Sequence, residues 1–401
     1  MSGEILFLAH RVPYPPDRGD KIRSWNVLKA IAALAPTHVV GLLDPADDPE
    51  TGRAEIGAVA TSFHAEPVSL SRPQAVAKAL LTGQPASVCA FSSGSLATCV
   101  QTLLAERPIR TIYAFSGQMA QFVPLQRAGR RFVMDFVDMD SAKFAAFAAE
   151  RQGLSGFANQ MEARRLLAFE KAVANRADMS LFVSAAEAAL FRAMSGLGPD
   201  RIGVLENGID LEKFSPDRAY PEVDAGGTPL IVFTGQMDYR PNIKAAGIFA
   251  REALPLIRAV HPDAVFAIVG RAPTSEVRAL SVLPGVLVTG EVPDTRDWLA
   301  AADVVVAPLR LARGIQNKVL EAMAMAKPVV TSLDAAQGID AKSGKELMVA
   351  QGSRAEAQAI LKLLANPEKA EALGKAARAR MAARYGWDAR MAGLPQILGL
   401  D

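Results

Sequence analysis

Short apolar runs alternate with longer segments of helical periodicity along almost the whole chain. Most runs are apolar on both faces, which predicts strands of parallel sheets covered by helices on each side. The predicted strands are 4–10, 38–43, 111–115, 131–137, 179–184, 201–208, 229–235, 264–270, 286–292, 303–309 and 328–332. Helices are expected near 20–35, 117–128, 158–176, 242–259, 294–301, 318–327 and within 355–384. This alternation predicts an α/β protein with doubly wound parallel sheets.

The alternation breaks near 211–228, where prolines, two adjacent glycines and several charges show neither period. The chain has 401 residues, too many for one hydrophobic core, so two domains are expected: 1–210 and 211–384. In doubly wound folds ligands bind at the carboxyl ends of the strands. We therefore expect a cleft between two such halves, lined by residues that follow strands.

Composition excludes several classes of protein. With 44 basic and 42 acidic residues the net charge is +2, which offers no case for nucleic-acid binding. Two cysteines and four scattered histidines form neither a disulfide framework nor a metal cluster and fit the cytoplasm. No apolar run is long enough for a transmembrane helix. A peripheral contact with the inner face of the cytoplasmic membrane stays open, although no clean amphipathic basic segment stands out.

The segment "RGIQNKVLEAMAMAKPVV" (313–330) raises the main question about function. It follows a buried strand, so a loop should lead into a helix whose first turn offers free N–H groups to an anion. Lys318 adds positive charge there, and Glu321 lies on the same face one turn later. A phosphate at the helix start and a ribose diol against Glu321 would suit this face. A solvated i,i+3 ion pair explains the spacing equally well.

Two further loops follow predicted strands. In "PYPPDRGDKIRS", Gly19 lets the backbone pass close to a ligand, with Asp20, Lys21 and Arg23 at the start of the next helix. Alternatively, Asp20 caps that helix and both cations are solvated. In "MDFVDMDSAK", Asp138 and Asp140 stand beyond the strand, where paired carboxylates suit acid–base work or hydroxyl binding. A simpler interpretation is that Asp140 caps the helix that follows.

Several of these segments together resemble the retaining GT-B glycosyltransferases of family 4. The matching segments are "NKVLEAMAMAKPVV", "LENGIDLEKFSP" (205–216), "ADMSLFVSAAEAALFRA" (177–193), "FTGQMDYRPN" (233–242), "LAAADVVVAPL" and "RYGWDARMAGL". The opening "HRVPYPPDRGDKIRSWNVLKAI" resembles a sugar transferase subgroup of the PEP-CTERM/exosortase exopolysaccharide system. The resemblance implies two Rossmann-like domains facing across a cleft, with a C-terminal helix at 385–401 packing back on the first domain.

The resemblance also implies roles for particular residues. Lys318 should hold the donor diphosphate and Glu321 the ribose, with Asp138 and Arg313 beside the transferred sugar. Arg313 replaces a glutamate usual in the family, and Gln236 and Pro241 replace its arginine and lysine. Other donor-binding residues are expected at Gly235, Arg240, Gly270, Arg271, Glu291, Val292, Gly314, Ile315, Gln316 and Asn317. Acceptor-side residues are expected at Gly19, Asp20, Lys21, Arg23 and Asp140, whereas His10 and Glu170 are interpreted as structural.

These features lead to three hypotheses. The first is transfer of a hexose from a nucleotide-diphosphate sugar to a lipid-linked or oligosaccharide acceptor, with no cofactor and no metal. The second is a nucleotide-sugar epimerase, which incubation with donor alone would reveal. The third is a GT-B scaffold that binds donor without turnover, motivated by Arg313 and Gln236. The sequence names neither the sugar nor the acceptor, because loop geometry reads their hydroxyls.

Overall fold

The protein is described by a computed structural model that covers residues 3–44, 49–68, 70–150, 153–310 and 315–400. The chain divides into two compact units. Unit 1 comprises Met1–Asn207 and Arg390–Asp401, and unit 2 comprises Gly208–Ala389. The sequence placed these divisions at 210/211 and 384/385.

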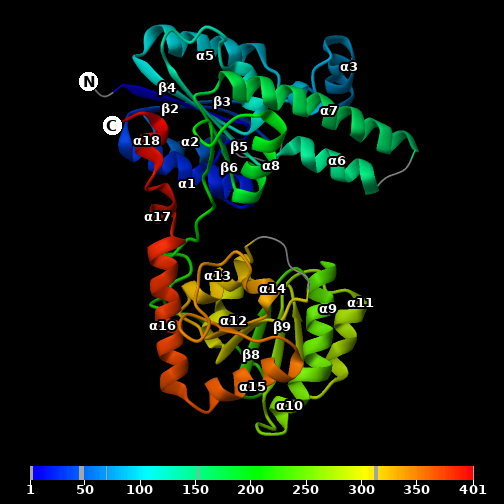
Figure 1. Cartoon of the computed structure of the whole chain (residues 1–401). Coiled ribbons are helices and arrows are strands. Elements are labelled where there is room, and N and C mark those ends of the chain that lie inside the picture. Colours follow the sequence, from blue (N-terminus) through cyan, green and yellow to red (C-terminus); the bar gives the residue numbers. More distant parts are fainter. Residues whose placement is uncertain (1–2, 45–48, 69, 151–152, 311–314, 401) are drawn as a thin grey trace. The chain divides into compact units, whose positions relative to one another are not determined.

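Unit 1 contains a parallel seven-stranded sheet in the order β3-β2-β1-β4-β5-β6-β7 (Figure 1). The strands are β1 (Glu4–Ala9), β2 (Thr37–Leu43), β3 (Ser62–Pro67), β4 (Ile109–Phe115), β5 (Arg131–Val137), β6 (Met179–Phe182) and β7 (Ile202–Val204). The central strands are apolar and almost fully buried, as a sheet covered on both faces requires. The strand order reverses between β1 and β4, which marks the ligand-binding edge of such a sheet.

The helices of unit 1 connect these strands. They are α1 (Gly19–Leu34), α2 (Pro49–Gly57), α3 (Arg72–Thr82), α4 (Ala86–Cys89), α5 (Gly94–Glu106), the 3-10 helix η1 (Gly117–Phe122), α6 (Asp140–Glu150), α7 (Gly153–Arg176) and α8 (Ala185–Ser195). Figure 1 shows α6 and α7 side by side, and the two helices pack closely. The predicted helix at 117–128 is wrong, since η1 ends at Phe122 and Pro124 follows soon after.

The end of the chain returns to unit 1. In place of one helix over 385–401, the structure has α17 (Trp387–Met391) and α18 (Leu394–Leu398), because Pro395 lacks the N–H that a continuous helix needs. The backbone of α18 lies against the sheet of unit 1. Thr111 Oγ1 donates to the Leu398 carbonyl at 3.0 Å, and Arg131 Nε donates to the Ile397 carbonyl at 2.7 Å.

Unit 2 contains a parallel six-stranded sheet in the order β10-β9-β8-β11-β12-β13. The strands are β8 (Leu230–Thr234), β9 (Val265–Val269), β10 (Val286–Gly290), β11 (Val304–Ala307), β12 (Val329–Thr331) and β13 (Met348–Val349). Its helices are α9 (Arg240–Ile248), the π-helix η2 (Phe249–Ala253), α10 (Leu254–Arg258), α11 (Ser275–Arg278), the 3-10 helix η3 (Ala279–Val282), α12 (Thr295–Ala301), α13 (Asn317–Ala324), α14 (Leu333–Ala336), α15 (Ser353–Leu364) and α16 (Pro367–Arg384). The order reverses between β8 and β11.

The predicted α/β class with two doubly wound parallel sheets is confirmed. The elements that the sequence missed include β3, β13, helices α2 to α5 and the short helices α11 and α14. One predicted helix, 242–259, is interrupted by the π-turn at Phe249–Ala253, just before Pro255 near the start of α10. Within the described residues, no helix combines the length and the apolar character needed to cross a bilayer.

Candidate functional site

The best candidate site lies at the edge of the unit 2 sheet where the strands have their carboxyl ends. At the reversal of strand order, the loop after β8 and the start of α13 meet. Helix α13 buries Val319, Leu320 and Met323 against the core, which leaves Lys318 and Glu321 half-buried on its other face. The side chain of its N-cap residue, Gln316, does not cap the first turn. Within the described residues the backbone N–H groups of Asn317 and Lys318 have no backbone acceptor, so they are open to a ligand.

The ammonium of Lys318 lies over the end of β8. Its Nζ donates to Asn242 Oδ1 at 2.7 Å and lies 4.5 Å from the ring centroid of Phe233. Among the described residues no carboxylate comes within ion-pair distance of this Nζ. Burial lowers the pKa of Lys318 to about 8, although Glu321 acts in the opposite direction. The structure thus holds a cation, partly withdrawn from water, at a helix start that has no matching anion among the described residues.

Asn242 connects this cation to the loop after β8. It is 5% exposed, and its Nδ2 donates to the Gln236 carbonyl at 2.9 Å. Pro241, which takes the place of a family lysine, is explained by its position near the start of α9, where proline is favoured. Gln236 itself accepts a hydrogen bond from Arg271 Nη2 at 3.1 Å. The two loops that follow β8 and β9 are therefore joined at the site.

Two glycines make the close packing of this edge feasible. A Cβ at Gly235 would lie 2.8 Å from Lys318 Nζ and 2.8 Å from Asn242 Nδ2. A Cβ at Gly270, whose φ is +147°, would lie 1.8 Å from the Gly235 carbonyl oxygen. Both predicted glycines therefore lie at the site, and the second has no room for any side chain.

Glu321 is half-buried one turn after Lys318. Burial raises the pKa of its carboxyl group, while Lys318 and Lys213 act to lower it. No hydrogen bond to its carboxylate occurs in the part of the chain that the structure describes. A carboxylate that lacks protein donors can accept hydrogen bonds from a ligand's hydroxyl groups.

A pocket of about 560 Å³ adjoins the ends of β9 and β10. Its lining residues are Ala272, Pro273, Arg278, Ser281, Val288, Thr289, Gly290 and Glu291. Of the residues predicted near a nucleobase, Glu291 lines this pocket and Arg271 directly precedes it in the chain. Val292 instead packs partly against the core of the unit.

The remaining donor-side predictions divide into three groups. Arg313 and Gly314 lie outside the described residues. Ile315 packs partly against the core, whereas Asn317 is exposed at the first residue of α13. Arg240 is exposed at the first residue of α9, and within the described residues its side chain forms no hydrogen bond or ion pair.

In unit 1, the end of β1 meets the start of α1. Asp20 forms ion pairs with Arg11 at 3.0 Å and Arg18 at 3.1 Å, and its carboxylate lies 3.4 Å from His10 Nε2. Although burial acts in the opposite direction, the hydrogen bond from His10 and the nearby arginines hold the pKa of Asp20 well below its usual range. Asp20 is thus committed to a local ionic network. Gly19 opens α1 on the exposed surface.

The sequence predicted that Lys21 and Arg23 line an open site. The structure instead buries both residues, which are 2% and 1% exposed. Arg23 Nη2 forms a buried ion pair with Asp135 at 3.0 Å, and its Nη1 donates to Asn207 Oδ1 at 2.9 Å. Tyr113 donates its hydroxyl to the same carboxylate at 2.7 Å. A buried charge needs such partners, so Arg23 belongs to the interior of unit 1.

Asp138 and Asp140 do lie near each other at the end of β5. Asp138 is exposed; Asp140 accepts a hydrogen bond from Gln118 at 3.2 Å, and burial, with a smaller effect of Asp138, raises its pKa. A small pocket contains both carboxylates together with Glu170. Burial raises the pKa of Glu170 to about 7, although its two oxygens accept hydrogen bonds from Ser141. Within the described residues no group of side chains could hold a metal ion.

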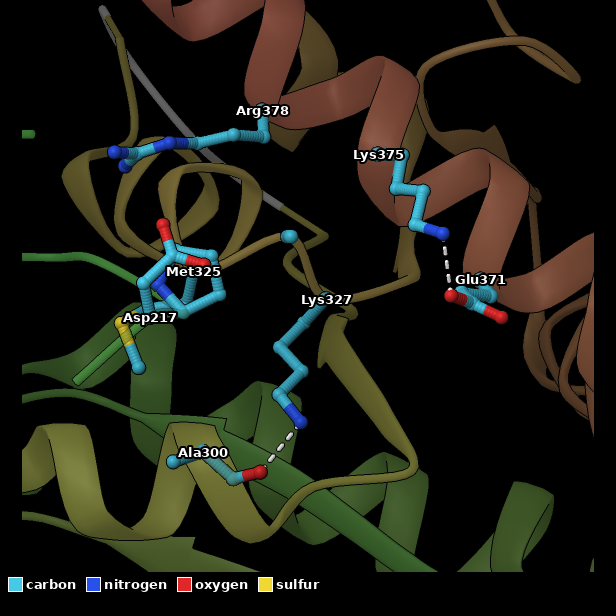
Figure 2. A pocket seen from close by; sticks show the side chains of 9 residues that line it. Asp217, Ala300, Met325, Lys327, Glu371, Lys375 and Arg378 are labelled. Carbon is cyan, nitrogen blue, oxygen red and sulfur yellow. Dashed lines mark hydrogen bonds and ion pairs between the residues drawn. The ribbon is translucent and has the colours of Figure 1, made fainter. Parts of the chain in front are cut away.

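A second pocket of unit 2, of about 470 Å³, lies near residues that precede β11 and β12 (Figure 2). Figure 2 shows Lys327 directed at the Ala300 carbonyl and Lys375 at Glu371. Arg378 donates to the Leu211, Phe214 and Ala324 carbonyls. The basic side chains here all have protein partners, which are backbone carbonyls for Lys327 and Arg378 and a carboxylate for Lys375.

Sequence reasoning missed Asn242 and Phe233 as neighbours of Lys318. Asn242 stands 76 positions before Lys318 in the chain, so spacing gave no indication of their contact. The available signal was that Asn242, a polar residue, directly follows Pro241 in the segment after a predicted strand.

Two family models match the chain, one in each unit. "Glycosyltransferase Family 4" matches residues 25–213, and "Glycosyl transferases group 1" matches residues 228–366. The fold is therefore that of the GT-B glycosyltransferases, built from two Rossmann-like units. The chain belongs to the group 1, or family 4, glycosyltransferases.

Curated relatives agree with this assignment. A phosphatidyl-myo-inositol mannosyltransferase of Propionibacterium freudenreichii is 30% identical over 53% of this chain and 54% of its own length. A GDP-mannose-dependent alpha-(1-6)-phosphatidylinositol monomannoside mannosyltransferase of Mycolicibacterium smegmatis is 27% identical over 76% of this chain and 80% of its own. The chain thus spans only about half of the first of these relatives.

Solved structures support the fold. HepE of Anabaena, in complex with UDP, has a TM-score of 0.62 at 15% identity and covers 99% of this chain and 100% of its own. Sucrose-phosphate synthase of Thermosynechococcus elongatus has a TM-score of 0.59 at 20% identity, covering 99% and 98%. At such low identity these likenesses concern the arrangement of the chain alone.

Proposed function

We propose that this glycosyltransferase moves a hexose from a nucleotide-diphosphate sugar to a lipid-linked or oligosaccharide acceptor, with retention at the anomeric carbon. The observation that carries the proposal is the Lys318 ammonium, held by Asn242 at a helix start with no matching carboxylate among the described residues. A diphosphate is the ligand that such a cation and open N–H groups favour.

The proposed chemistry follows from the same geometry. When the bond between the sugar and the diphosphate breaks, negative charge grows on the leaving oxygen. Lys318 and the first turn of α13 lie where they would stabilise that charge. The leaving phosphate accepts the proton of the acceptor hydroxyl, so no protein nucleophile is needed. Glu321, one turn deeper, accepts hydrogen bonds from the ribose hydroxyls.

The pocket beside Glu291 supplies room for a nucleobase. Its volume of about 560 Å³ is of the size that small-molecule sites have. We therefore place the diphosphate beside Lys318 at the start of α13, and the base toward the ends of β9 and β10. That neither cofactor nor metal is required is part of the proposal.

Fewer observations bear on the identity of the acceptor than on that of the donor. Relatives named for phosphatidyl-myo-inositol or a phosphatidylinositol monomannoside favour a lipid acceptor, whereas one named for D-inositol 3-phosphate favours a water-soluble polyol phosphate. The resemblance of residues 10–31 to transferases of exopolysaccharide loci favours a lipid-linked intermediate of that pathway. The phosphatidylinositol-type and exopolysaccharide-type acceptors share one chemical class, a hydroxyl-bearing glycan or polyol on a lipid.

A thermal-shift panel of UDP, GDP, TDP, their sugars and inorganic pyrophosphate tests the donor site, because a bound ligand stabilises the folded state. We expect one nucleotide series to stabilise the protein, and pyrophosphate to do so more weakly. Lys318→Ala should lose both responses, whereas Glu321→Gln should lose the nucleotide response and keep that of pyrophosphate. Lys369→Ala, at an exposed position on α16, is the control.

Turnover separates the remaining alternatives. Donor incubated alone should not yield an epimer by NMR, and donor with a lipid-linked acceptor should yield a glycosylated product. Donor binding without turnover on any acceptor would instead identify a binding scaffold. If Lys318→Ala keeps full transferase activity, the proposed site is wrong.

A further inference from the structure

Helix α3 faces the rest of unit 1 with its smallest side chains. Ala75 and Ala79 are 3% and 2% exposed and form a small cluster with Cys89. The gain from burial grows with the apolar area removed from water. A helix that only had to pack on its own unit would therefore place its larger side chains inward. Here the larger ones face outward.

The outward positions form one continuous apolar stripe. Pro73, Val76, Ala77, Leu80 and Leu81 are all exposed, at the i, i+3, i+4, i+7, i+8 spacing of one helix face. Among them Val76 is 50%, Leu80 64% and Leu81 88% exposed. We call these five residues the outer α3 face. No polar side chain interrupts the stripe, which is the pattern of a surface that something else covers.

The charges near this face are mainly positive. Helix α3 and the turn after it contain no acidic residue, and the helix carries the partly exposed Lys78. Arg165 of α7 reaches the end of the helix, where its Nη1 donates to the Ala79 carbonyl at 3.2 Å. The carboxylate of Glu162, also on α7, is occupied by hydrogen bonds from the start of α4. Apolar side chains flanked by cations match a layer of anionic lipid headgroups over acyl chains.

The area of the stripe argues against a second protein copy. Its exposed side chains offer on the order of a few hundred Å², whereas a stable protein interface takes about 800 Å² from each partner. A lipid surface sets no such threshold, because shallow insertion of a few aliphatic side chains contributes to binding residue by residue.

We propose that the outer α3 face docks the protein on anionic lipid membranes, with Leu80 and Leu81 inserted among the acyl chains and Lys78 near the headgroups. The contact itself stands on the geometry of α3. Its use, bringing the enzyme to a lipid-linked acceptor, rests on the proposed function.

Flotation of the full chain with lipid vesicles tests the proposal. The vesicles are phosphatidylcholine alone, and phosphatidylcholine mixed with an equal amount of phosphatidylglycerol. Wild-type protein should float with the mixed vesicles and much less with neutral ones. The double variant Leu80→Gln/Leu81→Gln should partition at least about tenfold more weakly, since burying one leucine side chain is worth roughly that factor. Lys78→Gln should weaken binding to mixed vesicles only.

A matched control replaces two apolar side chains of similar exposure elsewhere. Leu125 and Val282 are 85% and 83% exposed, so Leu125→Gln/Val282→Gln removes comparable area. This control should float like wild type. Equal flotation of the α3 variant and wild type, or no flotation of wild type, overturns the proposal. So does a wild-type dimer that the α3 variant abolishes without any vesicle binding.

Donor binding, followed by thermal shift in the same samples, keeps the two proposals apart. A protein that binds its nucleotide but no vesicles contradicts docking and leaves the donor site standing. A protein that binds vesicles through α3 but binds no nucleotide contradicts the donor site and leaves membrane docking standing.

Discussion

Asn242 holds the ammonium of Lys318 against the carboxyl end of β8. The amide oxygen accepts a hydrogen bond from Nζ at 2.7 Å, and the amide nitrogen donates to the Gln236 carbonyl at 2.9 Å. These two bonds fix the orientation of the amide group. Phe233 lies beneath the cation, 4.5 Å from Nζ to the ring centroid. The result is a cation fixed in position by neutral groups, which leaves its charge available to a ligand.

Replacing Asn242 should separate position from charge. Asn242→Ala leaves Lys318 without its acceptor, and donor affinity should fall about tenfold, the usual loss for one buried hydrogen bond. Asn242→Asp keeps an acceptor for Nζ but loses the N–H that donates to the Gln236 carbonyl, and it supplies a competing carboxylate, so affinity should fall further, about hundredfold. Calorimetric titration with the preferred nucleoside diphosphate measures both. Asn175→Asp, at an exposed position on α7, is the matched control. Unchanged affinity in Asn242→Asp would contradict the model.

Donor affinity should depend on pH through Lys318. Burial lowers its pKa to about 8, so the free protein loses this cation as pH rises through that value. Affinity should therefore weaken above about pH 8, approaching tenfold per pH unit until the bound state also titrates. Lys318→Arg should remove this dependence, because a guanidinium stays charged throughout. A wild-type affinity that is constant from about pH 7 to about pH 9.5 would exclude Lys318 as the diphosphate cation.

Gly270→Ala should disrupt the edge of the unit 2 sheet. The new methyl group would lie 1.8 Å from the Gly235 carbonyl oxygen, so the two loops must move apart. We expect a loss of about 3 kcal/mol or more in the free energy of unfolding, together with loss of donor binding. Gly226→Ala is the control, since its φ is +73° but no atom lies within 4 Å, and it should lose only about 1 kcal/mol. Equal losses in the two variants would refute the steric argument.

Glu170 should make unit 1 less stable as pH rises. Its folded pKa of about 7 lies above the ordinary value of 4.5, so between these values the folded state holds a proton that the unfolded state releases. Stability therefore falls through this window, by on the order of 3 kcal/mol in total. Glu170→Gln mimics the protonated form, so its stability relative to wild type should increase with pH. Denaturant unfolding at both ends of the window measures this. A difference that does not change with pH would contradict the assignment.

The sequence predicted the central strands because they are buried on both faces and read as continuous apolar runs. It missed β3, whose residues "SFHAEP" lie at the edge of the sheet and are half-exposed, and β13, which has only two residues. It also passed over 71–106, where alanines and exposed leucines obscure the helical period. The outer α3 face lies in that stretch, which explains why no docking segment stood out.

The candidate site could be predicted only as far as local spacing reaches. Lys318 and Glu321 share a helix face, and that follows from their separation of three residues. Asn242 and Phe233 come to Lys318 through the sheet, which no local pattern records. Arg23 was misplaced for a similar reason: its partner Asp135 is 112 positions away and fully buried.

The two places where the chain passes between units lie close together within each unit. Glu206 pairs with Arg390 in unit 1, and Ile209 bridges to Gly386 in unit 2. Residues 208–389 therefore leave and rejoin the rest of the chain at almost one point, as a module inserted into a host does. Such a module can be excised and produced alone, or exchanged for the equivalent segment of another enzyme. On the proposed function, in which unit 2 holds the donor, the same exchange would alter donor choice without rebuilding unit 1.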